Sequence, residues 1–313
     1  MSQIDGEVQI QRFEKDLFSI DTLQIQGALK NLTTKYPAFF PFYIQDLMRL
    51  AMLNDSLQAE KEIKAFIYNK DIRSVYDTSQ LHFKSLDWLE KDLSQAFKYY
   101  RYYVGKGESI PQVVSVVSAF NTAAFTFGNT HLGISLDMYL GKDFGVYPLI
   151  KIPHYVSNRL SPEYIVPNAM MSWLKGRFPE PQKQTRFIDQ MMYEGKLLYA
   201  LDLVLPTTAD TLKTGFTAQQ LEWCEENEKN IWSFIIGEKL LYETDAIKIS
   251  KYINDAPTTS GMPPQSPGRV ANWLGKRMVE TFMENFPKTT LQELFAIEDG
   301  QEILQKSRYK PPQ

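Results

Sequence analysis

The chain has 313 residues, of which 43% are hydrophobic and 13% aromatic, so it is long enough to bury a large core. Its 34 basic and 37 acidic residues form no long basic block, so nucleic acid is not an expected partner. The single cysteine, Cys224, excludes an intramolecular disulfide and a cysteine-ligated zinc cluster.

Hydropathy along the chain excludes an obvious membrane span. No window approaches the roughly 20 apolar residues that a transmembrane helix needs. The start of the chain is polar and charged, without the apolar core of a signal peptide. We therefore expect a soluble chain, either as it stands or as the mature part of an exported protein whose leader has been removed.

The N-terminal third, about residues 10–105, is predicted to be helical. Ile25, Leu29 and Leu32 form one apolar stripe. A second helix is predicted over residues 42–52, entered at Pro41, and a third over 61–68. Apolar residues over 86–100 predict a long amphipathic helix that ends near two glycines, at positions 105 and 107.

The next segment, about residues 111–140, is predicted to form a small sheet of two to four strands. Residues 112–120 are rich in β-branched side chains, which favour a strand. A turn is expected near Gly128 and Asn129, and the alternating residues 131–139 predict a further strand.

Helices are predicted to resume over about residues 161–308. Ser161 is a capping serine followed by proline, and the segments beginning at Thr217 and Thr290 fit the capping box. Residues 266–269 (SPGR) open a helix expected from Val270 to about Asn285. The proline-rich segment 255–267 before it reads as an ordered loop that borders a cleft. The simplest organisation is a single domain over residues 1–313, α+β in class and mainly α-helical.

A carboxylate interrupts an apolar stripe in the predicted helix after Phe187. The stripe continues through Met191, Leu198 and Leu201, and Glu194 fills its gap. A buried carboxylate must be paired, protonated or functional. We expect Glu194 to be buried and paired with Arg269, Arg277 or His131, either as a core ion pair or as the floor of a cleft that holds a peptide terminus or side chain.

A second acidic residue raises the same question. Glu228 lies between Trp223 and Trp232, and tryptophans at that spacing favour packing over function.

The motifs of common enzymes are missing. The three histidines, His82, His131 and His154, are not spaced for a zinc helix, and the frame around Glu194 (YEGKL) lacks both imidazoles. There is no G-x-S-x-G, Walker loop or G-x-G-x-x-G motif. We therefore expect no tightly bound zinc, no cofactor and no enzymatic activity.

Seven segments, in order along nearly the whole chain, resemble the gliding-motility lipoprotein GldB family of the Bacteroidota. They are RFEKDLF (12–18), YPAFF (36–40), GNTHLGISLDMYLG (128–141), MMYEGK (191–196), WCEENE (223–228), SPGR (266–269) and SRYKP (307–311). The resemblance implies a cell-envelope protein, anchored through a lipidated N-terminal cysteine, with a role in gliding and partners in the gliding or secretion machinery. The chain departs from this pattern because it shows no leader or lipobox, and Cys224 lies too deep to be the anchor.

The family is also similar to zinc peptidases of the H-E-x-x-H kind. Glu194, Gly195 and Gly268 would fill corresponding places while the histidines are missing, which implies a degenerate zincin-like fold without metal. Two functions stay open: a non-catalytic envelope protein that binds a partner protein or peptide, and a hydrolase or peptidase with an unrecognised site. The candidate cleft residues are Asn129, His131, Tyr193, Glu194, Arg269, Trp273 and Arg277.

Overall fold

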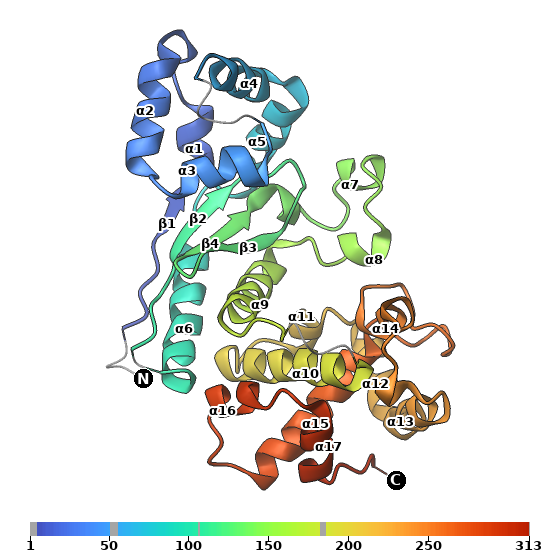
Figure 1. Ribbon diagram of the computed structural model, residues 1–313. Coiled ribbons are helices and arrows are strands. Elements are labelled where there is room, and N and C mark those ends of the chain that lie inside the picture. Colours follow the sequence, from blue (N-terminus) through green and yellow to red (C-terminus); the bar gives the residue numbers. More distant parts are fainter. Residues whose placement is uncertain (1–4, 51–55, 106, 182–185, 313) are drawn as a thin grey trace.

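A small mixed sheet separates N-terminal from C-terminal helices in the computed structural model, which describes residues 5–50, 56–105, 107–181 and 186–312 (Figure 1). Three strands run parallel and β3 pairs antiparallel with β4, in the order β1-β2-β4-β3. The predicted class, mainly helical α+β with a small sheet, is confirmed. The strands are β1 (Ile10–Arg12), β2 (Gln112–Val116), β3 (Ala124–Phe127) and β4 (His131–Ser135).

Both faces of the sheet are buried. Val113 packs into the large hydrophobic cluster of the C-terminal helices, whereas Val114 and Val116 pack into the cluster of the N-terminal helices. A strand covered on both faces carries apolar side chains at successive positions, which explains the β-branched run in β2. The two clusters thus share one sheet, and the single-domain organisation stays a prediction.

The predicted strands are longer than the observed ones. β2 ends at Val116 because Ala119 and Phe120 take left-handed conformations, with φ of 52° and 64°. The carboxylate of Asp137 holds this turn by accepting the N–H groups of Ser118 (2.9 Å) and Phe120 (2.7 Å). Asp137 itself lies in a 3₁₀ turn that follows β4 directly. The sheet also includes β1, which lies outside the predicted segment.

The N-terminal helices cover one face of the sheet (Figure 1). The stripes around Ile25 and over residues 61–68 fall in helices, as predicted. The single helix predicted over 42–52 is wrong, since α3 ends at Phe42 and a π-helical turn follows; positions 51 and 52 lie outside the described residues. The helices here are α1 (Phe13–Phe18), α2 (Ile25–Lys35), α3 (Phe39–Phe42), α4 (Ser56–Tyr68) and α5 (Lys70–His82).

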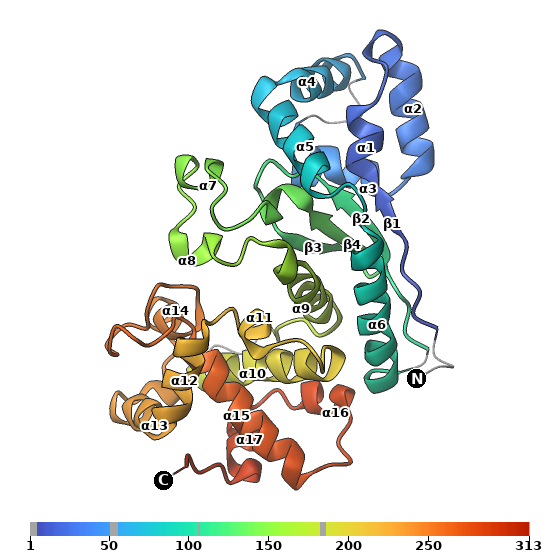
Figure 2. The ribbon, with the colours of Figure 1, turned by 180° about the vertical axis from the view of Figure 1, so that it is seen from behind.

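The other face of the sheet packs on α6 (Asp87–Tyr103) and α9 (Ile165–Arg177), seen from behind in Figure 2. Beyond them, α10 (Phe187–Val204) crosses α15 (Val270–Asn285) at very short range. A Cβ on Gly195 would lie 2.3 Å from the carbonyl carbon of Gly275, so the crossing depends on glycine at this point.

Shorter helices complete the C-terminal half. The capping boxes at Thr217 and Thr290 are both present, as predicted. Ser161 makes no capping hydrogen bond, and a 3₁₀ turn precedes α9. These helices are α11 (Asp210–Thr214), α12 (Ala218–Glu226), α13 (Glu228–Gly237), α14 (Ala246–Ile253), α16 (Leu291–Ala296) and α17 (Gly300–Ser307).

Residues 141–160 form an arm that carries α7 (Val146–Leu149) and α8 (His154–Ser157). The arm projects from the body beside α14 in both ribbon views (Figures 1 and 2). Among the described residues, no helix has the length and apolar character required to cross a membrane.

Candidate functional site

Glu194 lies on α10 but not in the predicted ion pair. Its Oε1 is 2.8 Å from Nζ of Lys175, and its side chain is 18% exposed. The prediction that Glu194 is buried and paired with Arg269, Arg277 or His131 is therefore wrong, since the side chain is partly exposed and its partner is Lys175. An apolar stripe does not identify the buried face here, because α10 is buried on nearly every side. Asp189 and Lys196 on the same helix are more deeply buried than Glu194.

Three other predicted cleft residues have structural roles. The Tyr193 hydroxyl donates to the Phe178 carbonyl at 2.9 Å, and burial raises the pKa of Tyr193. Trp273 is buried in the core. Arg277 pairs with Glu228, which is buried, as the packing interpretation of that acid predicts.

His131 and Asn129 lie at the turn between β3 and β4. The sheet lies in the middle of the molecule, whereas α15 lies among the C-terminal helices (Figure 1). The His131 ring stacks near Phe39, with ring centroids 6.2 Å apart, and burial lowers the pKa of His131. Asn129 is exposed. The structure therefore does not bring the predicted residues together into one cleft.

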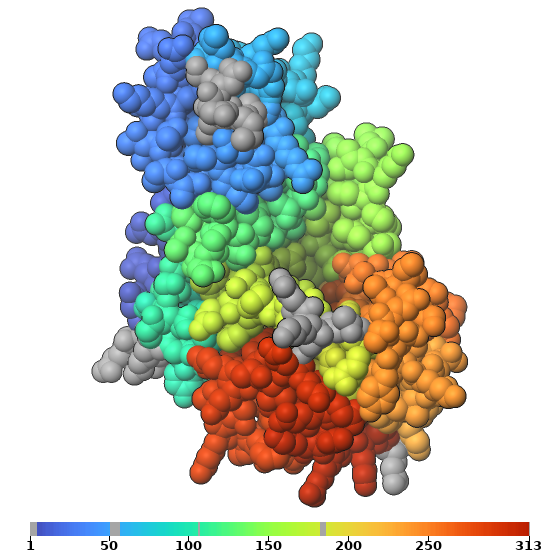
Figure 3. All heavy atoms as spheres, viewed as in Figure 1, coloured from blue at the N-terminus to red at the C-terminus, as the bar shows by residue number. Residues whose placement is uncertain are grey.

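Arg269, however, lies in a pocket of about 380 Å³ between the arm, the start of α12 and the ends of the 255–267 loop. The predicted position of this loop beside a cleft is supported, since Ala256, Pro257 and Pro267 line the pocket. The space-filling view of Figure 3 shows the arm (yellow-green) next to the orange segment that leads into the loop. The remaining lining residues are Lys142, Tyr155, Asn158, Arg159, Tyr164, Thr211, Gly215, Phe216, Thr217, Ala218, Gln220, Asp255 and Gly268.

Two arginines share one carboxylate in this pocket. Asp255 is 2.6 Å from Nε of Arg269 and 2.9 Å from Nη2 of Arg159. Burial acts to raise the pKa of Asp255, but the two guanidinium groups outweigh it and hold that pKa below its ordinary value. Burial lowers the pKa of Arg269, an effect that Asp255 opposes.

The pocket carries an excess of positive charge. Arg159, Arg269 and Lys142 contribute three positive charges, and Asp255 is the one acidic residue among the described lining residues. The difference, 3 − 1, leaves two positive charges. An anion that enters the pocket can therefore pair with guanidinium and ammonium groups that Asp255 does not neutralise.

Glycines allow the backbone to approach these charged groups. A Cβ on Gly268 would lie 2.3 Å from the Ala256 carbonyl oxygen, so the two ends of the loop touch here. A Cβ on Gly215 would lie 2.5 Å from Cδ of Arg159, and the φ of Gly215 is 71°. Gly268 thus lets the two ends of the loop meet, and Gly215 lets the backbone approach Arg159 and Arg269.

The loop between these ends is ordered by its own hydrogen bonds. Thr259 donates its hydroxyl to the Pro267 carbonyl (2.6 Å) and its N–H to Ser266 Oγ (3.2 Å). Gly261 turns the chain with a φ of 80°. Ser266 therefore does not cap α15, whose start is Arg269 in a left-handed conformation with a φ of 61°.

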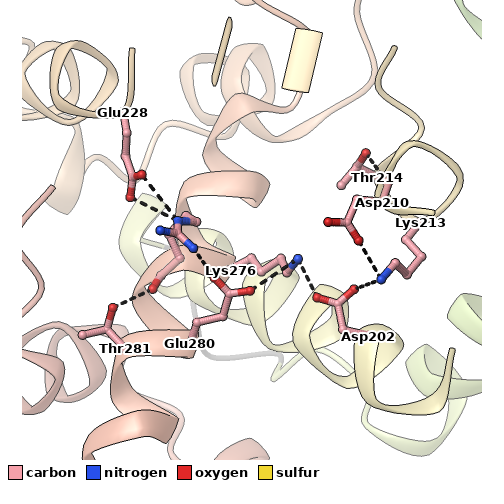
Figure 4. Close-up of polar contacts among 9 residues, drawn as sticks. Asp202, Asp210, Lys213, Thr214, Glu228, Lys276, Glu280 and Thr281 are labelled. Atoms are coloured by element: carbon pink, nitrogen blue, oxygen red, sulfur yellow. Dashed lines mark hydrogen bonds and ion pairs between the residues drawn. The ribbon is translucent and has the colours of Figure 1, made fainter. Parts of the chain in front are cut away.

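A chain of ion pairs holds the helices behind the pocket (Figure 4). Lys213 of α11 contacts Asp210 (2.7 Å) and Asp202 (2.5 Å), and Lys276 of α15 contacts Asp202 (2.5 Å) and Glu280 (3.4 Å). The Lys213 and Lys276 side chains are only 7% and 11% exposed, so they need these partners.

The same chain continues toward the C-terminus. Arg277 contacts Glu280 at 2.8 Å and Glu228 at 3.3 Å, and the Tyr309 hydroxyl donates to Glu228 at 2.5 Å. The ion pairs thus connect α11, α10, α15 and α13, and the hydrogen bond of Tyr309 adds the C-terminal segment.

Thr214 joins this network to the pocket. Its hydroxyl donates to the Asp210 carbonyl (2.7 Å), and its own carbonyl accepts Nη2 of Arg269 (2.8 Å). Because Lys213 anchors α11 on α10, the carbonyl that orients Arg269 is fixed in space. The network therefore positions the pocket arginine.

Sequence reasoning identified Arg269 and the loop but missed Lys142, Arg159 and Asp255 as pocket residues. Asp255 is the first residue of the proline-rich loop, and this position is the one sequence feature that could have indicated its place in the pocket. Nothing in the sequence places Lys142 and Arg159 beside it, since they lie about a hundred residues upstream on the arm.

Comparisons with known proteins place the chain in one family. The model of a family described as "Gliding motility protein GldB" matches residues 1–311. No curated protein and no solved structure matches the chain significantly, so the similarity to zinc peptidases stays a prediction. Within the described ranges, no group of three or more histidine, cysteine, aspartate or glutamate side chains is placed to hold a metal ion.

Proposed function

Because the chain belongs to the family of the gliding motility protein GldB, we propose that it is a non-catalytic envelope protein that binds a partner of the gliding or secretion machinery. Family membership gives it a role in gliding motility, and the lipoprotein character of the family places it in the cell envelope. In this proposal the binding site is the pocket at Arg269, and any attachment to the membrane is through an N-terminal lipid anchor outside this sequence, whose one cysteine is Cys224.

One observation carries the proposal: the pocket has more positive charge than its own carboxylate neutralises. Arg159 and Arg269 are held in fixed positions by Asp255 and Thr214. Arginines oriented before a ligand arrives lose little side-chain freedom on binding, which favours capture of an acidic group. An acidic segment of a partner protein fits this arrangement.

The same geometry favours a binding function for the pocket over a catalytic one. A general acid or base works best when its pKa lies near the working pH. The two arginines lower the pKa of Asp255 below its ordinary value, so this carboxylate stays charged near neutral pH. Asp255 therefore serves to orient the arginines.

The test is a charge reversal at Lys142, which is exposed and lines the pocket. A gliding bacterium that lacks its own copy of the protein is complemented with the wild type, with Lys142→Glu, or with Lys229→Glu. Lys229 is exposed on α13 and is not among the pocket residues, so it controls for the same change in net charge. We expect Lys142→Glu to reduce colony spreading at a normal protein level, and Lys229→Glu to glide like the wild type.

Normal spreading of the Lys142→Glu strain at wild-type protein level would show that the pocket has no role in motility. An equal loss of colony spreading in both variants would show that the change in net charge, and not the pocket, causes the effect.

A further inference from the structure

The pocket combines anion-binding groups with apolar walls in a small space. Its volume, about 380 Å³, is at the low end of the range for small-molecule sites. A folded surface, a helix or a strand of a partner is too large to enter it. Only a side chain or the end of a chain fits.

The anion-binding groups come from two parts of the chain, the arm and the start of α12. Arg159 forms its ion pair with Asp255 through Nη2. Lys142, which also lines the pocket, forms no ion pair within the described part of the chain. The start of α12, with Thr217 and Ala218, also lines the pocket. The capping box satisfies the N–H of Gln220 with the Thr217 hydroxyl, while helix geometry leaves the N–H of Ala218 without an intrahelical acceptor.

The apolar walls lie beside these groups. They are the rings of Tyr155, Tyr164 and Phe216 together with Pro257 and Pro267. The Phe216 ring also supports Arg269, whose guanidinium carbon lies 5.8 Å from the ring centroid. The pocket therefore offers a place for an apolar side chain within a few ångströms of the cationic groups.

From this combination we infer that the pocket captures the free C-terminus of a partner polypeptide, with an apolar last residue. The inference rests on the proposed function and names the segment that is bound. A chain terminus carries its α-carboxylate and its last side chain on the same Cα, so both groups enter one small cavity together. An internal aspartate or glutamate brings only the carboxylate and leaves the apolar walls without a partner. Capture of terminal carboxylates by backbone N–H groups is a known mode of peptide recognition.

Fluorescence anisotropy with three labelled pentapeptides tests the inference. The first is Gly-Ser-Gly-Ser-Phe with a free carboxylate, and the second is Gly-Ser-Gly-Glu-Phe with a C-terminal amide, which has the same charge in a side chain. The third, Gly-Ser-Gly-Ser-Phe amide, has no acidic group. We expect the free acid to bind at least about tenfold more tightly than either amide, because the arginines prefer a carboxylate held next to the ring contacts.

Variants of pocket residues test whether the change in anisotropy comes from peptide bound in the pocket. Arg159→Gln and Lys142→Glu should each weaken binding of the free acid, while Lys229→Glu should bind it as the wild type does. Circular dichroism of each variant checks that it is folded.

Two results would overturn the inference. Equal binding of the free acid and the glutamate amide would show recognition of any acidic group, and would leave the proposed function intact. Absence of binding by all three peptides at millimolar concentration would exclude terminus capture, while the motility assay judges the proposed function separately.

Discussion

Asp137 is a fully buried carboxylate that holds a strained turn at the end of β2. It accepts N–H groups from Ser118 and Phe120, and Phe120 has a φ of 64°. Burial raises the pKa of Asp137 to about 6, although these hydrogen bonds act to lower it. The residue is therefore costly in its charged form and yet necessary for the path of the chain.

The stability of the protein should depend on pH through this residue. The folded pKa, about 6, lies above the ordinary value of 3.8, so the folded state binds more protons between these values. The free energy of unfolding should therefore fall as pH rises through this window, by about 3 kcal/mol from this group, and then level off. Asp137→Asn should remove this component, as measured by urea unfolding at pH 4, 5, 6 and 7. Parallel pH profiles for the wild type and Asp137→Asn would contradict the assignment.

At the scale of elements, the crossing of α10 and α15 organises the C-terminal half. Gly195 and Gly275 lie at the point of closest approach, where backbone meets backbone. Backbone atoms cannot move aside as the end of a flexible side chain can. We therefore expect that a side-chain carbon added to either glycine destabilises the protein.

Gly195→Ala should destabilise the protein by about 1–3 kcal/mol, because its Cβ would lie 2.3 Å from the Gly275 carbonyl carbon. Gly237→Ala is the matched control, since Gly237 ends α13 and an added Cβ there meets nothing within 4 Å. The free energy of unfolding of Gly237→Ala should be unchanged or higher by up to about 1 kcal/mol. Urea unfolding at one pH compares them, and equal stability of the two variants would refute the account of the crossing.

Local signals in the sequence were sufficient for many elements and insufficient for long-range pairing. The capping boxes at Thr217 and Thr290 and the helix from Val270 to Asn285 were predictable, since caps and periodicity act over a few residues. β1 was not, because its three residues form a strand by pairing with Val113 to Ser115, about a hundred residues further along the chain.

The same limit applies to the candidate site. The 255–267 loop could be predicted from its prolines and glycine, and Arg269 from its place at a helix start. The partner of Glu194 could not, because one apolar stripe does not reveal that α10 is enclosed on nearly all sides. The meeting of Arg159 with Asp255 depends on the path of the arm, which no local pattern encodes.

In the whole molecule, segments that are far apart in the sequence build the pocket. The arm contributes Arg159, the start of α12 contributes Ala218, and the 255–269 segment contributes Asp255 and Arg269. Ion pairs from Lys213 to Glu228 connect the helices behind it (Figure 4). The position of Arg269 is therefore linked through Thr214 to this network, and the proposed binding site is formed before a partner arrives.

Photo-crosslinking in living gliding cells tests whether the pocket binds a partner. A benzoylphenylalanine replaces Tyr155, which lines the pocket, and in a parallel strain replaces Tyr102, an exposed tyrosine on α6 that does not line it. We expect a discrete crosslinked product from Tyr155 that is absent from Tyr102 and is lost when Lys142→Glu is added. No product from Tyr155, or the same product from both positions, would contradict it.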